Sequence, residues 1–291
     1  MEISKDINLK VIGIGKVGMS IVQAFAQNGF QVQGTDVNKE IMDKGLKMVE
    51  KNLETLVSKE KLSAEERDAT LSRMEFSTDL DIIKDADVII EAVFEDMDLK
   101  KEMFKKIDKL VASKEALLLT NTSSLSVSEI ASVTKRPELV AGMHFFNPVP
   151  VMRLVEVVRG TLTSDETVEK IKALAKLMGK TPIVSTDSPA FIVNRMMNAL
   201  ICEAARIVEE GVGSVEDVDL GAKFGLGHPM GPFELIDFLS GIPLTIHVTE
   251  YMAEQLGDRF RLPVWVKNLN RAGMRGRETG RGFYDYTKKG E

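Results

Sequence analysis

Three glycines near the N-terminus constrain the fold of this chain more than any other feature. Gly13, Gly15 and Gly18 form the pattern G-x-G-x-x-G between a short apolar run and a stretch of helical character. In a strand–turn–helix unit the first glycine allows a tight turn, the second lets the backbone approach a pyrophosphate, and the third lets helix and strand pack closely. Asp36 ends the next apolar run, where a carboxylate accepts hydrogen bonds from ribose hydroxyls. The pattern predicts a dinucleotide site, with a glycine turn that binds no ligand as the lesser alternative.

The residues around Asp36 bear on which dinucleotide is bound. A carboxylate at this position repels the 2′-phosphate of NADP, and no arginine follows it closely. The next residues are Val37, Asn38 and Lys39. The sequence therefore favours NAD as the cofactor, and Lys39 is the one residue that leaves NADP open.

Strand and helix patterns alternate from about residue 9 to residue 187. Short apolar runs typical of buried strands lie at 9–13, 30–35, 87–92, 116–120, 139–143, 154–158 and 181–184. Helical patterns lie between them, and the capping pairs Ser126 with Glu129 and Thr163 with Glu166 open two of these helices. Such alternation predicts an α/β fold, a Rossmann-like, doubly wound and mainly parallel sheet with helices on both faces.

The pattern changes near residue 187, where we place a domain boundary. Ser188 followed by Pro189 is typical of a helix start, and the periodic segments beyond it are all helical. We expect residues 1–187 to form a Rossmann-like NAD-binding domain. Residues 188–291 should form an all-α C-terminal domain.

Composition and charge exclude several classes of function. The formal net charge is -6 and no basic cluster is visible, which argues against nucleic acid as a partner. Cys202 is the only cysteine, so no internal disulfide or cysteine-based metal site can form, and the three histidines lack metal-ligand spacing. No signal peptide and no membrane-spanning apolar run is visible. We expect a cytoplasmic protein that binds neither membrane nor metal.

A histidine and a glutamate stand out in the second half of the predicted sheet. His144 follows the run 139–143, and Glu156 lies inside the apolar run 154–158. A carboxylate in an apolar strand is costly to bury unpaired, and His144 could be its donor. Such a pair would fix the imidazole tautomer for proton transfer. A solvent-facing Glu156 on an edge strand is equally compatible with these residues.

Ser123 and Asn194 are weaker candidates when each is taken alone. Ser123 lies just past the strand end at residue 120, and ligands of open parallel sheets bind at the carboxyl ends of the strands. A plain turn with capping serines would look the same. Asn194 lies in an apolar helical stretch, where a hydrogen-bonded core amide is the other interpretation.

Taken together, the motifs resemble the L-3-hydroxyacyl-CoA dehydrogenase family, and most of all its bacterial short-chain members that act on 3-hydroxybutyryl-CoA. The resemblance covers nearly the whole chain. After the glycine loop it runs through NTSSLS (121–126), MHFFNPVPVM (143–152), LVEVV (154–158), FIVNR (191–195), GHPMGPFEL (227–235) and GRGFYDY (280–286). Matches of this length in this order are highly specific.

The resemblance implies an enzyme that interconverts (S)-3-hydroxyacyl-CoA and 3-ketoacyl-CoA by hydride transfer to or from NAD. His144 would be the general acid or base, and Glu156 would orient it. Ser123 and Asn194 would bind the reacting oxygen and help to place the substrate. Short acyl groups such as acetoacetyl are implied, as is a role in fatty acid or butanoate metabolism.

The resemblance also implies further binding residues and an assembly. Glu95, Lys100 and Asn121 match positions near the cofactor, while Asn52 and Lys59 are the candidates for contacts with the CoA tail. A homodimer through the C-terminal helices is expected.

Two other functions remain open at the level of sequence. The first is a sugar-acid (gulonate-type) dehydrogenase on the same scaffold, although the lysine-rich stretch 39–61 favours a phosphorylated CoA tail. The second is a non-catalytic, crystallin-like relative, against which the presence of all four catalytic-type residues argues. The acyl chain length and the physiological direction are not fixed by the sequence.

Overall fold

A sheet of eight strands organises the first of the two units into which the chain divides, 1–188 and 189–291. The computed structural model describes residues 2–239 and 241–287, and each unit is described by itself. The strands are β1 (Leu9–Ile12), β2 (Val32–Thr35), β3 (Met74–Ser77), β4 (Val88–Glu91), β5 (Leu117–Thr120), β6 (Val140–Phe145), β7 (Leu154–Arg159) and β8 (Thr181–Thr186).

The strand order is β3-β2-β1-β4-β5-β6-β7-β8, and neighbouring strands are parallel except β6 and β7. The exception follows from the connection 146–153, because parallel strands need a crossover of about a dozen residues or more. The expected Rossmann-like, mainly parallel sheet is confirmed. Its parallel part brings the carboxyl ends of β1, β4 and β5 to one edge, where ligands of such sheets bind.

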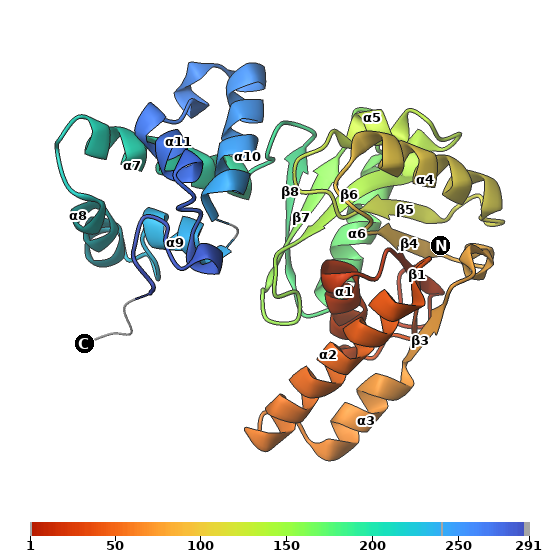
Figure 1. The fold of residues 1–291 in the computed structure, drawn as a ribbon. Helices are drawn as coiled ribbons and strands as arrows, with labels where there is room; N and C mark the ends of the chain where they lie inside the picture. The colour runs from red at the N-terminus through yellow and green to blue at the C-terminus, as the bar shows by residue number, and fades with distance from the viewer. Residues whose placement is uncertain (1, 240, 288–291) are drawn as a thin grey trace. The chain divides into compact units, whose positions relative to one another are not determined.

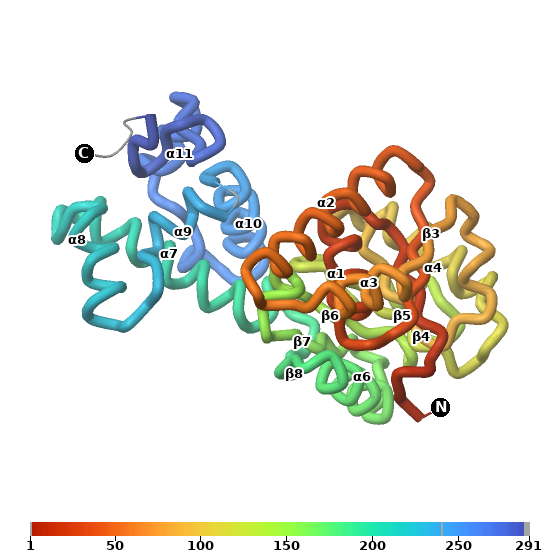
Figure 2. Tube along the Cα trace, turned by 90° about the horizontal axis from the view of Figure 1, so that it is seen from below, coloured from red at the N-terminus to blue at the C-terminus, as the bar shows by residue number. Residues whose placement is uncertain are grey.

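Helices cover both faces of this sheet (Figure 1). They are α1 (Lys16–Gln27), α2 (Lys39–Ser58), α3 (Ala64–Ser72), α4 (Met97–Leu110), α5 (Val127–Ala131) and α6 (Asp165–Leu177), with short 3-10 turns at Leu80–Ile83 and Pro137–Leu139. One apolar core joins α1, α2 and α6 to one face, and a second core joins α4 and α5 to the other. Figure 2 shows α6 alongside β7 and the edge strand β8.

Several local expectations are corrected by the structure. His144 lies inside β6 rather than after it, because the ladder with β7 continues to Phe145. Helix α6 is capped by Ser164, whose side chain accepts from the Thr167 N–H, and not by a pair of Thr163 and Glu166. The hydroxyl of Thr163 instead donates to the carbonyl of Val140.

The second unit is helical, as expected. Its helices are α7 (Val193–Glu209), α8 (Val215–Leu220), α9 (Pro232–Leu239), α10 (Gly241–Leu256) and α11 (Val264–Arg271), with a π-helical turn at Gly221–Gly225 and 3-10 turns at Asp258–Phe260 and Arg277–Thr279. The expected helix start at Ser188 and Pro189 is wrong. Ala190 and Phe191 have φ angles of 62° and 49°, in the left-handed region, so a right-handed helix begins only at Val193.

Two buried aspartates fasten the C-terminal segment inside the second unit. The Asp219 carboxylate accepts hydrogen bonds from the N–H groups at the start of α9 and, at 2.8 Å, from the Tyr284 hydroxyl. Asp237 accepts from the Tyr284 N–H and the Tyr286 hydroxyl, both at 3.1 Å. A side chain at Gly282 would lie 2.0 Å from an oxygen of Asp237. The motifs 227–235 and 280–286 therefore include residues that hold this unit together.

None of the helices in the described parts of the chain is long and apolar enough to cross a membrane.

Candidate active site

The glycine loop follows β1 and opens α1. Gly13 has a φ of 83°, and a Cβ there would lie 2.7 Å from the backbone nitrogen of Val93. A Cβ on Gly18 would lie 1.9 Å from the Gly13 carbonyl oxygen. Packing within the protein therefore requires both glycines. At Gly15 a Cβ would meet no protein atom within 4 Å, so the space beside it suits the approach of a ligand.

The surroundings of this loop fit a dinucleotide. The Asp36 carboxylate accepts hydrogen bonds from the N–H groups of Ile14 and Asn38, both at 3.1 Å, which ties the end of β2 to the loop. The first turn of α1 carries no acidic residue, and Lys16 lies there, exposed. A helix N-terminus of this kind attracts phosphate, while the neighbouring carboxylate suits ribose hydroxyls.

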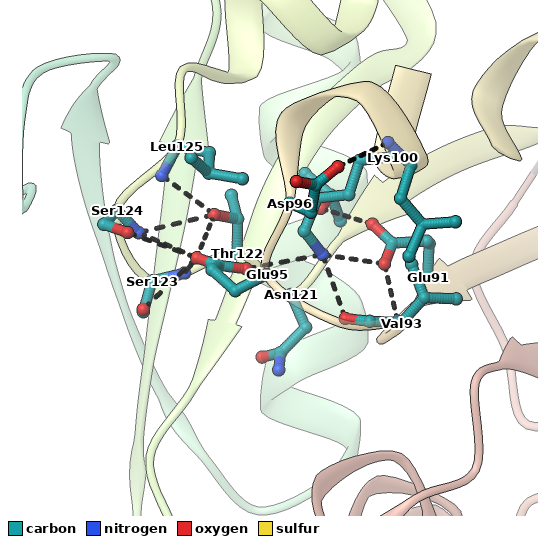
Figure 3. A network of polar contacts seen from close by, with 12 residues as sticks. Glu91, Val93, Glu95, Asp96, Lys100, Asn121, Thr122, Ser123, Ser124 and Leu125 are labelled. Atoms are coloured by element: carbon teal, nitrogen blue, oxygen red, sulfur yellow. Dashed lines mark hydrogen bonds and ion pairs between the residues drawn. The ribbon is translucent and has the colours of Figure 1, made fainter. Parts of the chain in front are cut away.

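A network of buried charges joins the ends of β4 and β5 (Figure 3). The Lys100 ammonium, from α4, lies 2.8 Å from Oε1 of Glu91 and 3.4 Å from Oε2 of Glu95. Glu91 also accepts from the Val93 N–H at 2.6 Å and from the Thr120 hydroxyl at 2.7 Å. Glu91 and Lys100 are fully buried, whereas the side chain of Glu95 is 35% exposed.

Glu95 holds the turn that follows β5. Its Oε1 accepts from the Thr122 hydroxyl at 2.6 Å and the Ser123 N–H at 2.8 Å, with the Ser123 hydroxyl at 3.3 Å. Burial raises the pKa of Glu95, but the charge of Lys100 and these hydrogen bonds outweigh burial, so the pKa lies below its usual value. The carboxylate therefore stays ionised at neutral pH and keeps the Ser123 turn in place.

Asn121 joins this turn to the next strand. Its Oδ1 accepts the Phe145 N–H at 2.9 Å, and its own N–H donates to the Glu91 carbonyl at 2.8 Å. The residue before Phe145 is His144. The amide of Asn121 therefore sets the end of β6 against the end of β5.

His144 and Glu156 face each other across the antiparallel pair of β6 and β7. They are register partners, and Nδ1 of His144 lies 2.8 Å from Oε2 of Glu156. Glu156 is fully buried and His144 is 5% exposed. The ring of Phe146 lies beside the imidazole, with 4.6 Å between ring centroids. An acceptor at Nδ1 places the hydrogen on that nitrogen and assigns proton exchange to Nε2.

The other candidates lie elsewhere. Asn194 belongs to the second unit, in the first turn of α7, where its carbonyl accepts from the side chain of Asn198 at 2.7 Å. Asn52 is exposed on α2, and Lys59 is the residue that ends that helix. Asn52 and Lys59 therefore lie towards the C-terminal end of this helix, which is about 30 Å long.

Glu91 was not identified from the sequence. The signal was available, because a carboxylate within the apolar run 87–92 poses the same burial problem as Glu156. Among the described residues, no group of three or more histidine, cysteine, aspartate or glutamate side chains could hold a metal ion.

Models of one protein family match almost the entire chain. The model described as "3-hydroxyacyl-CoA dehydrogenase, NAD binding domain" matches residues 8–188, and "3-hydroxyacyl-CoA dehydrogenase, C-terminal domain" matches residues 191–286.

Curated relatives and solved structures agree with these matches. The chain is 42% identical over 290 residues to a probable 3-hydroxybutyryl-CoA dehydrogenase of Bacillus subtilis, covering 99% of each chain. It is 43% identical over 281 residues to a 3-hydroxybutyryl-CoA dehydrogenase of Clostridioides difficile, covering 96% of this chain and 99% of the relative. The crystal structure of (S)-3-hydroxybutyryl-CoA dehydrogenase PaaH1 from Ralstonia eutropha matches with a TM-score of 0.93 at 39% identity, covering 97% of this chain and all of the other.

Proposed function

The chain belongs to the 3-hydroxyacyl-CoA dehydrogenase family, and on this premise we propose that it interconverts (S)-3-hydroxybutyryl-CoA and acetoacetyl-CoA with NAD. The observation that carries the proposal is the buried His144–Glu156 pair, on a sheet whose glycine loop fits a dinucleotide. The relatives named for 3-hydroxybutyryl-CoA support the short acyl chain. We place the reaction in the cytoplasm, in fatty acid or butanoate metabolism.

Each of the four proposed catalytic residues has its own role in the reaction. His144 gives a proton from Nε2 to the 3-keto oxygen on reduction and takes it back on oxidation. Glu156 holds the ring through Nδ1. Ser123 and Asn194 donate hydrogen bonds to the reacting oxygen and place it. When bound, NAD accepts or supplies the hydride at carbon 3.

The cofactor is held by the loop and by three strand ends. Gly13, Gly15 and Gly18 let the pyrophosphate reach the N-terminus of α1, and Asp36 accepts from the adenosine ribose. The remaining contacts, on the nicotinamide side, come from Glu95 and Asn121, and Lys100, which is fully buried, contributes by holding Glu95.

The remaining proposals concern the CoA tail of the substrate and the assembly of the protein. Asn52 and Lys59 contact the CoA tail from the exposed side of α2, a helix rich in lysine. Residues 1–187 bind NAD, and residues 188–291 form a homodimer and contribute Asn194 to the substrate site. Exposed apolar side chains of the second unit support the dimer, among them Phe224 at 84% and Leu226 at 66% exposure.

The decisive experiment mixes the purified protein with NADH and acetoacetyl-CoA and follows the absorbance of NADH. We expect fast oxidation of NADH, slow oxidation of NADPH, and a loss of about 10²-fold or more in kcat for His144→Gln. Free acetoacetate with NADH, and sugar acids with NAD⁺, serve as alternative substrates. Turnover of sugar acids but not of acetoacetyl-CoA would replace the proposal with the gulonate-type reaction. Tight NADH binding without turnover of any substrate would make the chain a non-catalytic relative.

A further inference from the structure

Two buried charged residues beside the proposed site take no part in the proton and hydride transfers. Glu91 and Lys100 are both 0% exposed, with 2.8 Å between ammonium and carboxylate. Removing two charges from water costs free energy that their attraction offsets only in good geometry, and apolar residues of similar size are often as stable. Stability alone therefore does not account for this pair.

The contacts of the pair explain its place in the fold. Glu91 is the last residue of β4, and its two carboxylate oxygens accept from the Val93 N–H and from the Thr120 hydroxyl at the end of β5. One side chain thereby fixes two neighbouring strand ends. Lys100 is held by Glu91 and by the Val93 carbonyl at 3.3 Å, and it reaches Glu95 at 3.4 Å.

Glu95 continues the chain of contacts to the site. It lies in the loop after β4, and its Oε1 binds the turn that carries Ser123 through the Thr122 hydroxyl and the Ser123 N–H (Figure 3). Its other oxygen faces Lys100. A shift of the ammonium would therefore move Glu95, and a shift of Glu95 would move the Ser123 turn.

We propose that Glu91 and Lys100 are a positioning pair, in which Glu91 holds the ammonium, the ammonium holds Glu95, and Glu95 holds the turn that presents Ser123. This inference rests on the proposed function, because it concerns how Ser123 and Glu95 are kept ready for substrate and cofactor. Glu91 acts entirely through the other members and touches none of the reacting atoms.

The double variant Glu91→Gln/Lys100→Met separates positioning from folding. The glutamine amide can still accept from the Val93 N–H and can donate to the Thr120 hydroxyl, while methionine fills the volume of the lysine stem. No buried charge is left without a partner, so we expect a melting temperature within a few degrees of the wild type. Lys100→Met alone would leave Glu91 charged and unpaired in the core, and we expect it to melt much earlier.

The readout is the affinity for NADH as a function of pH, measured by fluorescence titration. Besides Lys100, the charged side chains in the network around Glu95 are Glu91 from β4 and Asp96, which caps α4 through the Leu99 N–H (Figure 3). Within the described residues, the turn after β5 offers Glu95 only hydroxyl and N–H groups. Without Lys100, burial raises the pKa of Glu95 with no ammonium to oppose it. We expect the double variant to bind NADH about tenfold more weakly at pH 7, the loss of one charge-assisted contact, and to weaken further towards pH 5. The wild type should stay nearly flat over this range.

A second ion pair on the same helix provides the matched control. Asp108 of α4 pairs with Arg136 at 2.8 Å, with 7% and 14% side-chain exposure. Within the described residues, the other side-chain hydrogen bonds of this pair go to Lys135 and Ser113 and do not involve Glu95 or the Ser123 turn. Asp108→Asn/Arg136→Met removes a comparable pair, and we expect it to keep wild-type NADH affinity and pH dependence.

Wild-type NADH affinity and pH dependence in a folded double variant would overturn the inference. If the double variant does not fold, the single variant Glu91→Gln tests the positioning role. Its buried Lys100 ammonium still has Glu95 as a partner, so this variant should fold. We expect its kcat with acetoacetyl-CoA to fall about tenfold or more as Glu95 is drawn towards the ammonium and the Ser123 turn shifts. Unchanged kcat and NADH affinity in this variant would also refute the positioning role of Glu91 and Lys100. Failure of the wild type to oxidise NADH would instead refute the proposed function, and the NADH titrations would still test the pair.

Discussion

The contact between His144 and Glu156 shows how one residue can determine what another does. A histidine exchanges protons at either ring nitrogen, and the partner of one nitrogen decides the role of the other. Here the carboxylate lies 2.8 Å from Nδ1 and is fully buried, so no water competes for it. The acid–base role proposed for His144 therefore depends on a residue that need not approach the substrate.

We predict that Glu156→Gln lowers kcat by about 10²-fold or more while the KM for NADH changes by less than about twofold. The amide keeps a contact with Nδ1, but it no longer balances the charge of a protonated ring, and it can donate to Nδ1 and so favour the wrong tautomer. Steady-state kinetics with acetoacetyl-CoA and NADH measure both constants.

Glu75→Gln is the control for this prediction, because Glu75 is an exposed glutamate on β3 of the same sheet. It should leave both constants unchanged. A Glu156→Gln protein with wild-type kcat would remove Glu156 from the mechanism.

At the scale of elements, a lysine fastens the connection between β6 and β7. Lys180 precedes β8, is 8% exposed, and donates from Nζ to the carbonyls of Val149 and Met152, both at 2.7 Å. Burial lowers the pKa of this lysine. Its ammonium supplies hydrogen bonds that the backbone of the connection cannot make by itself.

We predict that Lys180→Met lowers the free energy of unfolding by about 2–4 kcal/mol, because two carbonyls lose their donor. Activity should fall less than in Glu156→Gln, since the ladder between β6 and β7 remains. Urea unfolding measures the change, and Lys176→Met, at an exposed position of α6, is the control. Equal urea midpoints for Lys180→Met and Lys176→Met would show that the hydrogen bonds of Lys180 do not stabilise the fold.

The elements with clear apolar patterns could be predicted from the sequence, and those without could not. The runs that became β1, β4 and β5 are fully buried and were recognised. Strand β3 was missed because it is an edge strand with one buried residue out of four, and the short helix α3 has too few buried positions to show a period. Helix α11 was missed for a similar reason, since only Val266 is buried there.

The candidate site was predictable as a set of residues but not as a network. Taken residue by residue, the sequence leaves Glu156 undecided between core and solvent. The register of β6 with β7 gives Glu156 a buried position opposite His144. The contacts of Glu95 depend on where α4 places Lys100 against β4, which no local pattern encodes. The family and its reaction class, inferred from the motifs, are confirmed by the comparisons.

At the scale of the whole molecule, the second unit carries large apolar side chains on its surface. Phe224 and Leu226 lie in and just after the π-helical turn, and Leu220 at the end of α8 is 47% exposed. Neighbouring exposed apolar residues of this size are uncommon on a monomer and mark an interaction site. This supports the homodimer proposed for residues 188–291.

We predict that Phe224→Glu halves the mass of the protein in sedimentation equilibrium, because a charge in an apolar interface has no partner. Leu162→Glu changes an exposed apolar residue of the first unit, 62% exposed against 84% for Phe224, and should leave the mass unchanged. A wild-type protein that is already monomeric, or a Phe224→Glu protein that remains dimeric, would place the interface elsewhere.

The antiparallel pairing of β6 and β7 bears on how the chain can diversify. His144 and Glu156 are separated by 12 residues, and the register of two adjacent strands alone puts them face to face. The entropy of closing the connection 146–153 changes slowly with its length, so insertions there leave the pair intact, whereas a slip of one residue within either strand would turn a partner to the other face. Descendants of this chain can therefore remodel the connection while inheriting both halves of the proposed acid–base pair as a single unit.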